Sequence, residues 1–141
     1  MPRYKELVIP YPHQSELAPI ALALLREHGI VYLAMEERTG KTLTAILVAE
    51  LSAAKSILVI TKKKAKDGWI ETLKAYKHKK LYDVTTYHQA HKLANLNYDL
   101  VLLDESHNYI SAFPKPGNLW RVLKPMLVNK PIVYISATPH A

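Results

Sequence analysis

The sequence predicts one α/β domain with a mainly parallel central sheet covered by helices on both faces. Two observations lead to this prediction. Several short runs are continuously apolar, such as SILVIT at 56–61 and YDLVLLDE at 98–105, and such strands are typically buried on both faces of a parallel sheet. These runs alternate along the chain with segments of helical periodicity, which is the order of a doubly wound fold. The length of 141 residues and the hydrophobic content of 49% suit a single domain, residues 1–141, with a sizeable core.

Each predicted element is bounded by its own signals. The segment SELAPIALALLREHG, residues 15–29, has apolar residues at helical spacing and ends at Gly29, a residue typical of helix ends. The predicted strands are IVYLAM (30–35), SILVIT (56–61), YDVTTY (82–87), YDLVLLDE (98–105) and PIVYISAT (131–138). The remaining predicted helices cover 41–54, the basic and amphipathic stretch 65–80, 88–96, and 119–128, which Pro125 interrupts. A turn-rich loop is predicted at 112–118.

Composition excludes several classes of protein. The chain has no cysteine, which rules out disulfides and thiolate metal sites and fits a reducing compartment. Its longest apolar run, Leu17 to Leu25, is too short for a membrane span, and its start lacks the apolar core of a signal peptide. Three histidines, His78, His88 and His91, show no metal-ligand spacing with other residues. We therefore expect a soluble cytoplasmic protein with no membrane partner.

The net charge of +7 favours a polyanionic partner such as nucleic acid, although a solvated lysine-rich surface gives the same total. Four lysines directly follow a predicted strand in TKKKAK, residues 61–66. A doubly wound sheet places its binding loops at that end of its strands. We predict that these lysines contact nucleic acid, and we call them the lysine cluster: Lys62, Lys63, Lys64 and Lys66. Trp69, on the following helix, is expected to pack in the core, with base stacking as the alternative.

A candidate phosphate-binding loop lies in LAMEERTGKTLTA, residues 33–45. Gly40-Lys41-Thr42 is the end of the pattern G-x-x-x-x-G-K-[ST], although Met35 stands where that pattern has its first glycine. A buried strand precedes the loop and a helix follows it, so the helix N-terminus would face the phosphates of a nucleotide. Lys41 would reach the β- and γ-phosphates, and the Thr42 hydroxyl would bind Mg²⁺. The alternative is an ordinary strand-to-helix turn. The candidate nucleotide-binding residues of the loop are Glu36, Arg38, Thr39, Gly40, Lys41 and Thr42.

A pair of acidic residues, Asp104 and Glu105, ends the apolar run in YDLVLLDESH, residues 98–107. Ligands of open α/β sheets bind at such strand ends. A site for Mg²⁺ and ATP needs one carboxylate for the metal, here Asp104, and a second to orient water and accept its proton, here Glu105. Two solvated acids at a strand end would be the alternative. With the loop upstream, the pair predicts an ATPase site in which Lys41 and Glu105 are catalytic.

The order of these motifs resembles the first motor domain of superfamily 2 helicases and translocases. The motifs TGKT (39–42), DESH (104–107) and SATP (136–139) follow one another as in that family, and the match covers nearly the whole chain. The loop LAMEERTGKT is similar to that of Swi/Snf-type translocases and phage helicases. DESH is a variant of the DEAH box with Ser106 in place of alanine, and Arg38 stands where many relatives have glycine. The resemblance implies a three-layer RecA-like P-loop fold.

The resemblance also implies roles for single residues. Gln14, in YPHQ (11–14), would read adenine, and Glu36 lies at the position of an acidic loop residue. His107 would couple the ATP site to nucleic acid, and capping of the local turn is the alternative. Ser136 and Thr138, in ISATP, would also couple hydrolysis to nucleic-acid movement, and their alternative is the polar end of a strand.

Two further stretches, ILVITKKKAKDGW (57–69) and VTTYHQA (84–90), resemble the family motifs that lie along the strand-binding groove. They predict Thr86 as a further nucleic-acid contact, in addition to the four residues of the lysine cluster.

The function implied is the ATP-binding motor domain of a DNA helicase or translocase of a bacterium or phage, with RNA as the alternative partner. Relatives need a second RecA-like domain, in cis or in trans, that closes the ATP cleft and supplies an arginine finger. The chain ends at Ala141, and none of its four arginines lies in such a domain. We expect a fragment or half of a split gene product, weakly active alone. A nucleotide-dependent adaptor and a small metabolic P-loop NTPase or kinase are the alternative functions.

Overall fold

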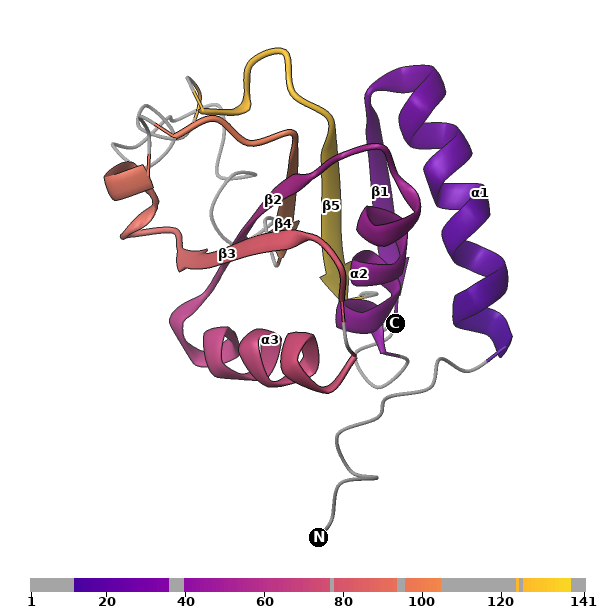
Figure 1. The fold of residues 1–141 in the computed structure, drawn as a ribbon, viewed down its shortest axis with the longest axis horizontal. Coiled ribbons are helices and arrows are strands. Elements are labelled where there is room, and N and C mark those ends of the chain that lie inside the picture. Colours follow the sequence, from indigo (N-terminus) through magenta and orange to yellow (C-terminus); the bar gives the residue numbers. More distant parts are fainter. Residues whose placement is uncertain are drawn as a thin grey trace, which may run out of the picture.

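A parallel sheet in the order β1-β5-β4-β2-β3 is the centre of the fold (Figure 1). The computed structural model describes residues 12–35, 40–76, 78–93, 96–104, 124 and 126–137, without the side chains of 12–15, 34–35 and 136–137. Within these ranges the strands are β1 (Ile30–Met35), β2 (Ser56–Thr61), β3 (Leu81–Thr86), β4 (Leu100–Asp104) and β5 (Ile132–Ala137). Every neighbouring pair is parallel, so the carboxyl ends of all the strands lie along one edge of the sheet. This confirms the predicted α/β class.

The helices between the strands are α1 (Pro12–His28), α2 (Lys41–Leu51), α3 (Lys63–Ala75) and the 3₁₀ helix η3 (Ala90–Leu93). As predicted, Gly29 terminates α1: it directly follows the last helical residue, His28, has a φ of 77° and donates its N–H to the carbonyl of Leu25 at 2.7 Å. A residue with a β-carbon is strained at this φ, which is why glycine suits the position. The helix termini therefore follow the sequence signals where those signals restrict the backbone directly.

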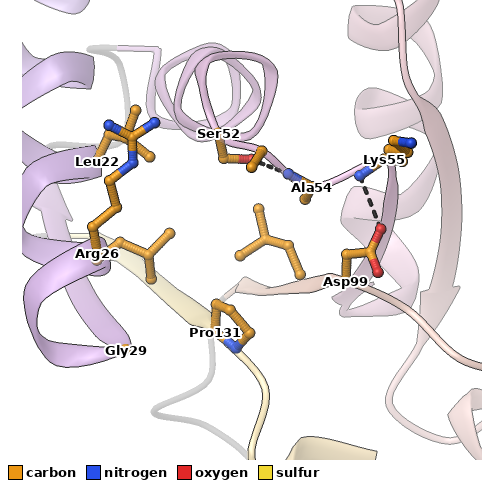
Figure 2. Close-up of a pocket in the computed structure, with 11 residues that line it drawn as sticks. Leu22, Arg26, Gly29, Ser52, Ala54, Lys55, Asp99 and Pro131 are labelled. Atoms are coloured by element: carbon orange, nitrogen blue, oxygen red, sulfur yellow. Dashed lines mark hydrogen bonds between the residues drawn. The ribbon is translucent and has the colours of Figure 1, made fainter.

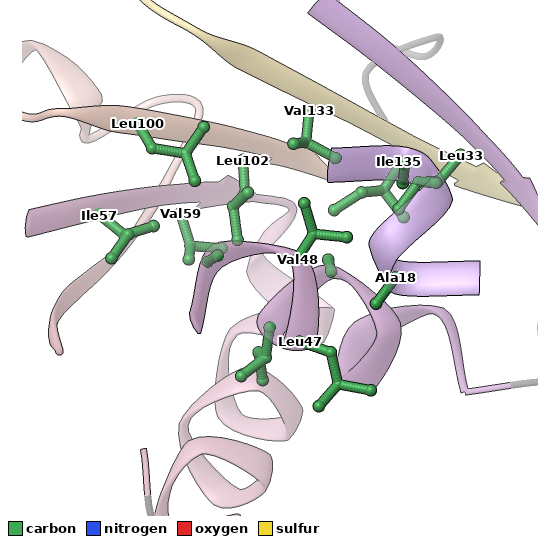
Figure 3. Close-up of a cluster of buried hydrophobic side chains, with 14 of the residues drawn as sticks. Ala18, Leu33, Leu47, Val48, Ile57, Val59, Leu100, Leu102, Val133 and Ile135 are labelled. Atoms are coloured by element: carbon green, nitrogen blue, oxygen red, sulfur yellow. The ribbon is translucent and has the colours of Figure 1, made fainter. Parts of the chain in front are cut away.

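Each face of the sheet has its own apolar cluster, because successive side chains of a strand point to opposite faces. On one face, Ala18 of α1 and Val48 of α2 pack in one cluster with Val59 and Leu102 of the sheet (Figure 3). Trp69 of α3 belongs to the same cluster. The opposite face packs against η3 and the helical residues 126–127, in a second cluster that contains Leu58, Ile60, Tyr87, Ala90, Tyr98, Val101, Leu103, Met126, Leu127 and Ile132. Helical residues thus cover both faces of the described sheet.

Several predicted helix boundaries differ from the structure. The first helix begins at Pro12 and not at residue 15. The helix predicted to end at residue 54 ends at Leu51, because the Ser52 hydroxyl donates to the carbonyl of Ala49 and accepts from the N–H of Ala54, which competes with another helical turn. The helix predicted at 65–80 begins at Lys63 and ends at Ala75. Beyond it, the Lys80 ammonium donates to the carbonyls of Ala49 and Ser52 at the end of α2.

The helix predicted at 88–96 is instead short and of 3₁₀ type. Its backbone bonds join residues three apart, from Gln89 to Thr86, from Lys92 to Gln89 and from Leu96 to Leu93. The predicted loop at 112–118 lies outside the described residues, as does most of the helix predicted at 119–128. No helix in the described part of the chain is long and apolar enough to cross a membrane.

Candidate nucleotide site

The carboxyl edge of the sheet brings the end of the predicted loop next to the predicted metal ligand. In the described residues, α2 begins directly after Gly40 on the connection from β1, and β4 ends at Asp104. Strands β2 and β4 are neighbours with Ile60 opposite Leu103, so the next residues, Thr61 and Asp104, lie side by side. The start of α2, the end of β2 and the end of β4 therefore lie close together at the carboxyl edge of the sheet.

Gly40 gives α2 its sharp start. Its φ of 76° and ψ of 41° are left-handed, a conformation that suits glycine and strains other residues. Its carbonyl accepts from the N–H of Thr44 at 3.0 Å and from the Thr44 hydroxyl at 3.1 Å. The helix therefore begins at Lys41, and the partial positive charge of its N-terminus lies at the same edge as Asp104.

Lys41 and Asp104 form a buried ion pair. The Lys41 Nζ lies 3.5 Å from the Asp104 Oδ1, and the two side chains are only 10% and 3% exposed. A buried charge is costly unless it is paired, so each group offsets the cost of the other. The sequence predicted both residues for one site, and the structure brings them together.

The two oxygens of Asp104 have different surroundings. Oδ2 accepts two hydrogen bonds, from the Thr61 hydroxyl and from the indole N–H of Trp69, both at 2.8 Å. Oδ1 is buried, faces Lys41 and has no hydrogen-bond partner among the described residues. The backbone carbonyl of Asp104 accepts from the Tyr87 hydroxyl at 2.8 Å, which fixes the end of β4 from the opposite face. One oxygen of the carboxylate is thus held by two hydrogen bonds, whereas the other is paired with Lys41 and accepts no hydrogen bond from the described residues.

The pocket beside this pair has a volume of about 230 Å³. The loop residues 36–39 and residue 105 lie outside the described chain, so the lining is described in part: Lys41, Thr42, Lys62, Ala65, Gly68, Trp69, Thr72 and Asp104. Mg²⁺ prefers oxygen ligands and binds nucleotides through one or two carboxylates together with phosphates and water. The buried, unbonded Oδ1 of Asp104 and the half-buried Thr42 fit that ion. The described residues contain no cluster of three or more His, Cys, Asp or Glu that could hold a metal by itself.

The lysine cluster lies at the same edge, at the start of α3. Lys63 and Lys64 are exposed, whereas Lys62 and Lys66 are half-buried. Thr86 ends β3 directly beside Thr61 and is only 9% exposed, so little of its side chain is accessible to a strand of nucleic acid.

Several predicted residues cannot be placed. Gln14 lies in α1 and Ser136 in β5, but their side chains are not described. The remaining predicted residues lie outside the described chain: Glu36, Arg38, Thr39, Glu105, His107 and Thr138.

Sequence reasoning missed the role of two residues. It assigned Trp69 to core packing, and Trp69 is indeed only 1% exposed, but its N–H also holds the predicted metal ligand. It did not single out Thr61, although this threonine ends a buried strand at the edge where ligands bind. The polar residue at the end of the apolar run SILVIT was the available signal.

A second, larger pocket lies at the opposite edge of the sheet, where the strands begin (Figure 2). Its volume is about 600 Å³, and its wall is mainly apolar, with contributions from Leu22, Leu25, Arg26, Gly29, Ser52, Ala53, Ala54, Lys55, Asp99, Leu100 and Pro131. Ligands of open α/β sheets bind at the carboxyl ends of the strands, so the smaller pocket is the better candidate despite its size.

Comparison with solved structures supports the same fold. The chain is similar over 100% of its length to the Sulfolobus solfataricus SWI2/SNF2 ATPase core in complex with double-stranded DNA, with a TM-score of 0.75 and 17% identity. It is similar over 92% of its length to the ATP-dependent Type ISP restriction-modification enzyme LlaBIII bound to DNA, with a TM-score of 0.70 and 13% identity. The chain spans 34% and 13% of those two proteins. No protein-family model and no curated protein sequence matches it. The chain therefore shares the RecA-like α/β fold of these two proteins, which is the fold that its motifs implied.

Proposed function

We propose that this chain is the ATP-binding motor domain of an ATP-dependent DNA helicase or translocase and that a second domain of the same fold completes its active site. The observation that carries the proposal is the buried pair of Lys41 and Asp104 at the N-terminus of α2. A lysine and a carboxylate at this point of a parallel sheet suit the phosphates and the metal of a bound nucleotide.

Each residue of the proposed site has a separate role. Lys41 binds the terminal phosphates, Thr42 and Asp104 hold Mg²⁺, and Glu105 orients the attacking water and accepts its proton. The metal ion supplies charge stabilisation of the transferring phosphoryl group when it is bound. If Lys41 contacts the phosphates instead of Asp104, Oδ1 of Asp104 would lose its paired cation and could then hold the metal ion.

The lysine cluster contributes the nucleic-acid face, with DNA as the proposed partner. Both solved structures of the same fold are complexes with DNA, and the net charge of +7 favours a polyanion. Translocation needs two domains that open and close around the nucleotide, and the second domain would also supply an arginine worth about 10³–10⁵ in rate.

A titration of the 141-residue chain with ATP and Mg²⁺ tests the nucleotide site. Lys41→Ala should abolish measurable binding while circular dichroism shows that the fold survives. The matched control is Lys55→Ala, because Lys55 is an exposed lysine at the opposite edge of the sheet, just before β2. Unchanged ATP affinity in folded Lys41→Ala would refute the assignment.

The adaptor alternative is separated from the motor by hydrolysis. In a protein completed by its second domain, a motor should show ATPase activity that DNA stimulates and that Glu105→Gln abolishes. Binding of ATP and DNA without stimulated turnover would instead favour a nucleotide-dependent adaptor.

A further inference from the structure

We propose that Trp69 and Thr61 are positioning residues for the metal ligand Asp104, and that their two hydrogen bonds decide which carboxylate oxygen is offered to the metal. This inference rests on the proposed nucleotide site and adds to it a mechanism for orienting the carboxylate from α3 and β2. It gives Trp69 a role beyond core packing.

The geometry supports an orienting role because both donors contact the same oxygen. The Thr61 hydroxyl and the Trp69 indole N–H each lie 2.8 Å from Oδ2 of Asp104, and neither donates to Oδ1. The terminal torsion of an aspartate is broad and its two oxygens are chemically equivalent. Two donors on one side remove this equivalence, so Oδ1 remains directed to Lys41.

Burial makes the arrangement rigid. Thr61 is fully buried, Trp69 is 1% exposed and Asp104 is 2% exposed. A buried indole N–H needs a partner, and it could have been satisfied by a backbone carbonyl of the core. Here its acceptor is the one buried carboxylate of the described residues, located at the end of β4 and beside Lys41 at the start of α2. Partners that orient metal ligands typically change metal affinity by about 10–100-fold when they are removed.

The same short segment also carries the lysine cluster. Thr61 ends β2, the lysines follow, and Trp69 lies within two turns of the start of α3. A polyanion that moves the start of α3 would therefore act directly on the two groups that hold Asp104. The proposal thus predicts a physical connection between the lysine cluster and the metal site.

The test separates metal-dependent from metal-independent ATP binding. Thr61→Val keeps the shape of the side chain and removes the hydroxyl, and Trp69→Phe keeps an aromatic ring and removes the N–H. Both variants should bind ATP in the presence of a chelator as the parent does, and both should need about tenfold more Mg²⁺ for half-maximal ATP binding.

Two variants serve as controls. Thr61→Ser retains the donor and should behave as the parent. Thr72→Val removes a hydroxyl from the same pocket wall, but that hydroxyl donates to the carbonyl of Gly68 at 2.9 Å and not to Asp104, so the Mg²⁺ requirement should not change. A purely structural role of the two donors would lower the urea midpoint of Thr61→Val and Trp69→Phe without changing their Mg²⁺ requirement, and that result would overturn the proposal.

A spectroscopic measurement on the parent does not depend on whether the variants fold. The chain has two tryptophans, so its proton NMR spectrum has two indole N–H signals, which Trp120→Phe assigns. The Trp69 signal should shift when Mg²⁺ is added in the presence of ATP, because the metal and the indole share one carboxylate. If Mg²⁺ strengthens ATP binding but the chemical shift of the Trp69 indole N–H does not change, the positioning role is refuted. If Mg²⁺ never strengthens ATP binding to the parent, the proposed nucleotide site itself fails, and the positioning role fails with it.

Discussion

Breaking the ion pair between Lys41 and Asp104 should destabilise the domain through the charge that is left behind. The charged atoms are 3.5 Å apart, and the side chains are 10% and 3% exposed. Coulomb's law at an effective dielectric constant of about 20 gives roughly 5 kcal/mol for this separation, of which desolvation offsets a large part. Lys41→Met keeps most of the length of the side chain and leaves the carboxylate unpaired. The expected loss in the free energy of unfolding is about 3 kcal/mol.

A double-mutant cycle isolates this electrostatic contribution. Asp104→Asn can still accept from Thr61 and Trp69, but it leaves the Lys41 ammonium unpaired, with an expected loss of about 2 kcal/mol. The double variant Lys41→Met/Asp104→Asn buries no charge, so its loss should also be only about 2 kcal/mol and not the sum of the single losses. The coupling between the two residues is then about 3 kcal/mol, at the upper end for contacting residues.

Urea denaturation of the four proteins, followed by circular dichroism, measures the cycle. Domains of this size are typically stable by about 5–15 kcal/mol, so each variant should remain folded without urea. The coupling should persist at high salt, since buried pairs are screened little. Additive losses, within about 0.5 kcal/mol, would show that the pair contributes no coupling and would refute the reasoning.

Two other predictions concern the surface. Replacing all four residues of the lysine cluster by alanine should make the affinity for DNA less dependent on salt. The slope of log affinity against log salt concentration should fall by up to about one unit for each phosphate contact that is lost. Identical slopes in parent and variant would place the nucleic-acid face elsewhere. Asp99 accepts from the backbone N–H groups of Lys55 and Ser56, and these bonds lower the pKa of its carboxyl. Its folded pKa lies below the unfolded value, so its stabilisation is present above about pH 4 and is lost as the pH falls through the folded pKa. Asp99→Ala should therefore lower the free energy of unfolding by about 1 kcal/mol or less near neutral pH, and the difference should vanish in acid; a difference independent of pH would contradict this account.

The sequence was informative wherever one local signal determines the backbone. Continuous apolar runs predicted the strands, and Gly40 and Gly29 marked a helix start and a helix end because both positions need a positive φ. It was less informative at the end of the predicted helix at 65–80. There Lys80 reaches the carbonyls at the end of α2, a contact that is distant in the sequence and leaves no local pattern.

The candidate site was predictable in its parts but not in its arrangement. Lys41 and Asp104 came from motifs, whereas the hydrogen bonds of Thr61 and Trp69 depend on β2 lying beside β4. That pairing is not sequential, because β3 comes between β2 and β4 in the chain but lies on the other side of β2 in the sheet. Local patterns do not encode which strands become neighbours, so the partners of a strand-end carboxylate could not be read from the sequence.

The polar groups around Asp104 are difficult to explain by stability alone. A buried ion pair is often replaced by apolar residues of similar volume with no loss of stability, or with a gain. Here the domain buries such a pair and adds two side-chain donors, from Thr61 and Trp69, to the same carboxylate. Even so, Oδ1 keeps no hydrogen-bond partner among the described residues, although an unbonded buried oxygen is itself unfavourable. An arrangement that holds one oxygen with two hydrogen bonds and gives the other only a charged neighbour, Lys41, is expected where a ligand, and not the fold, uses the second oxygen.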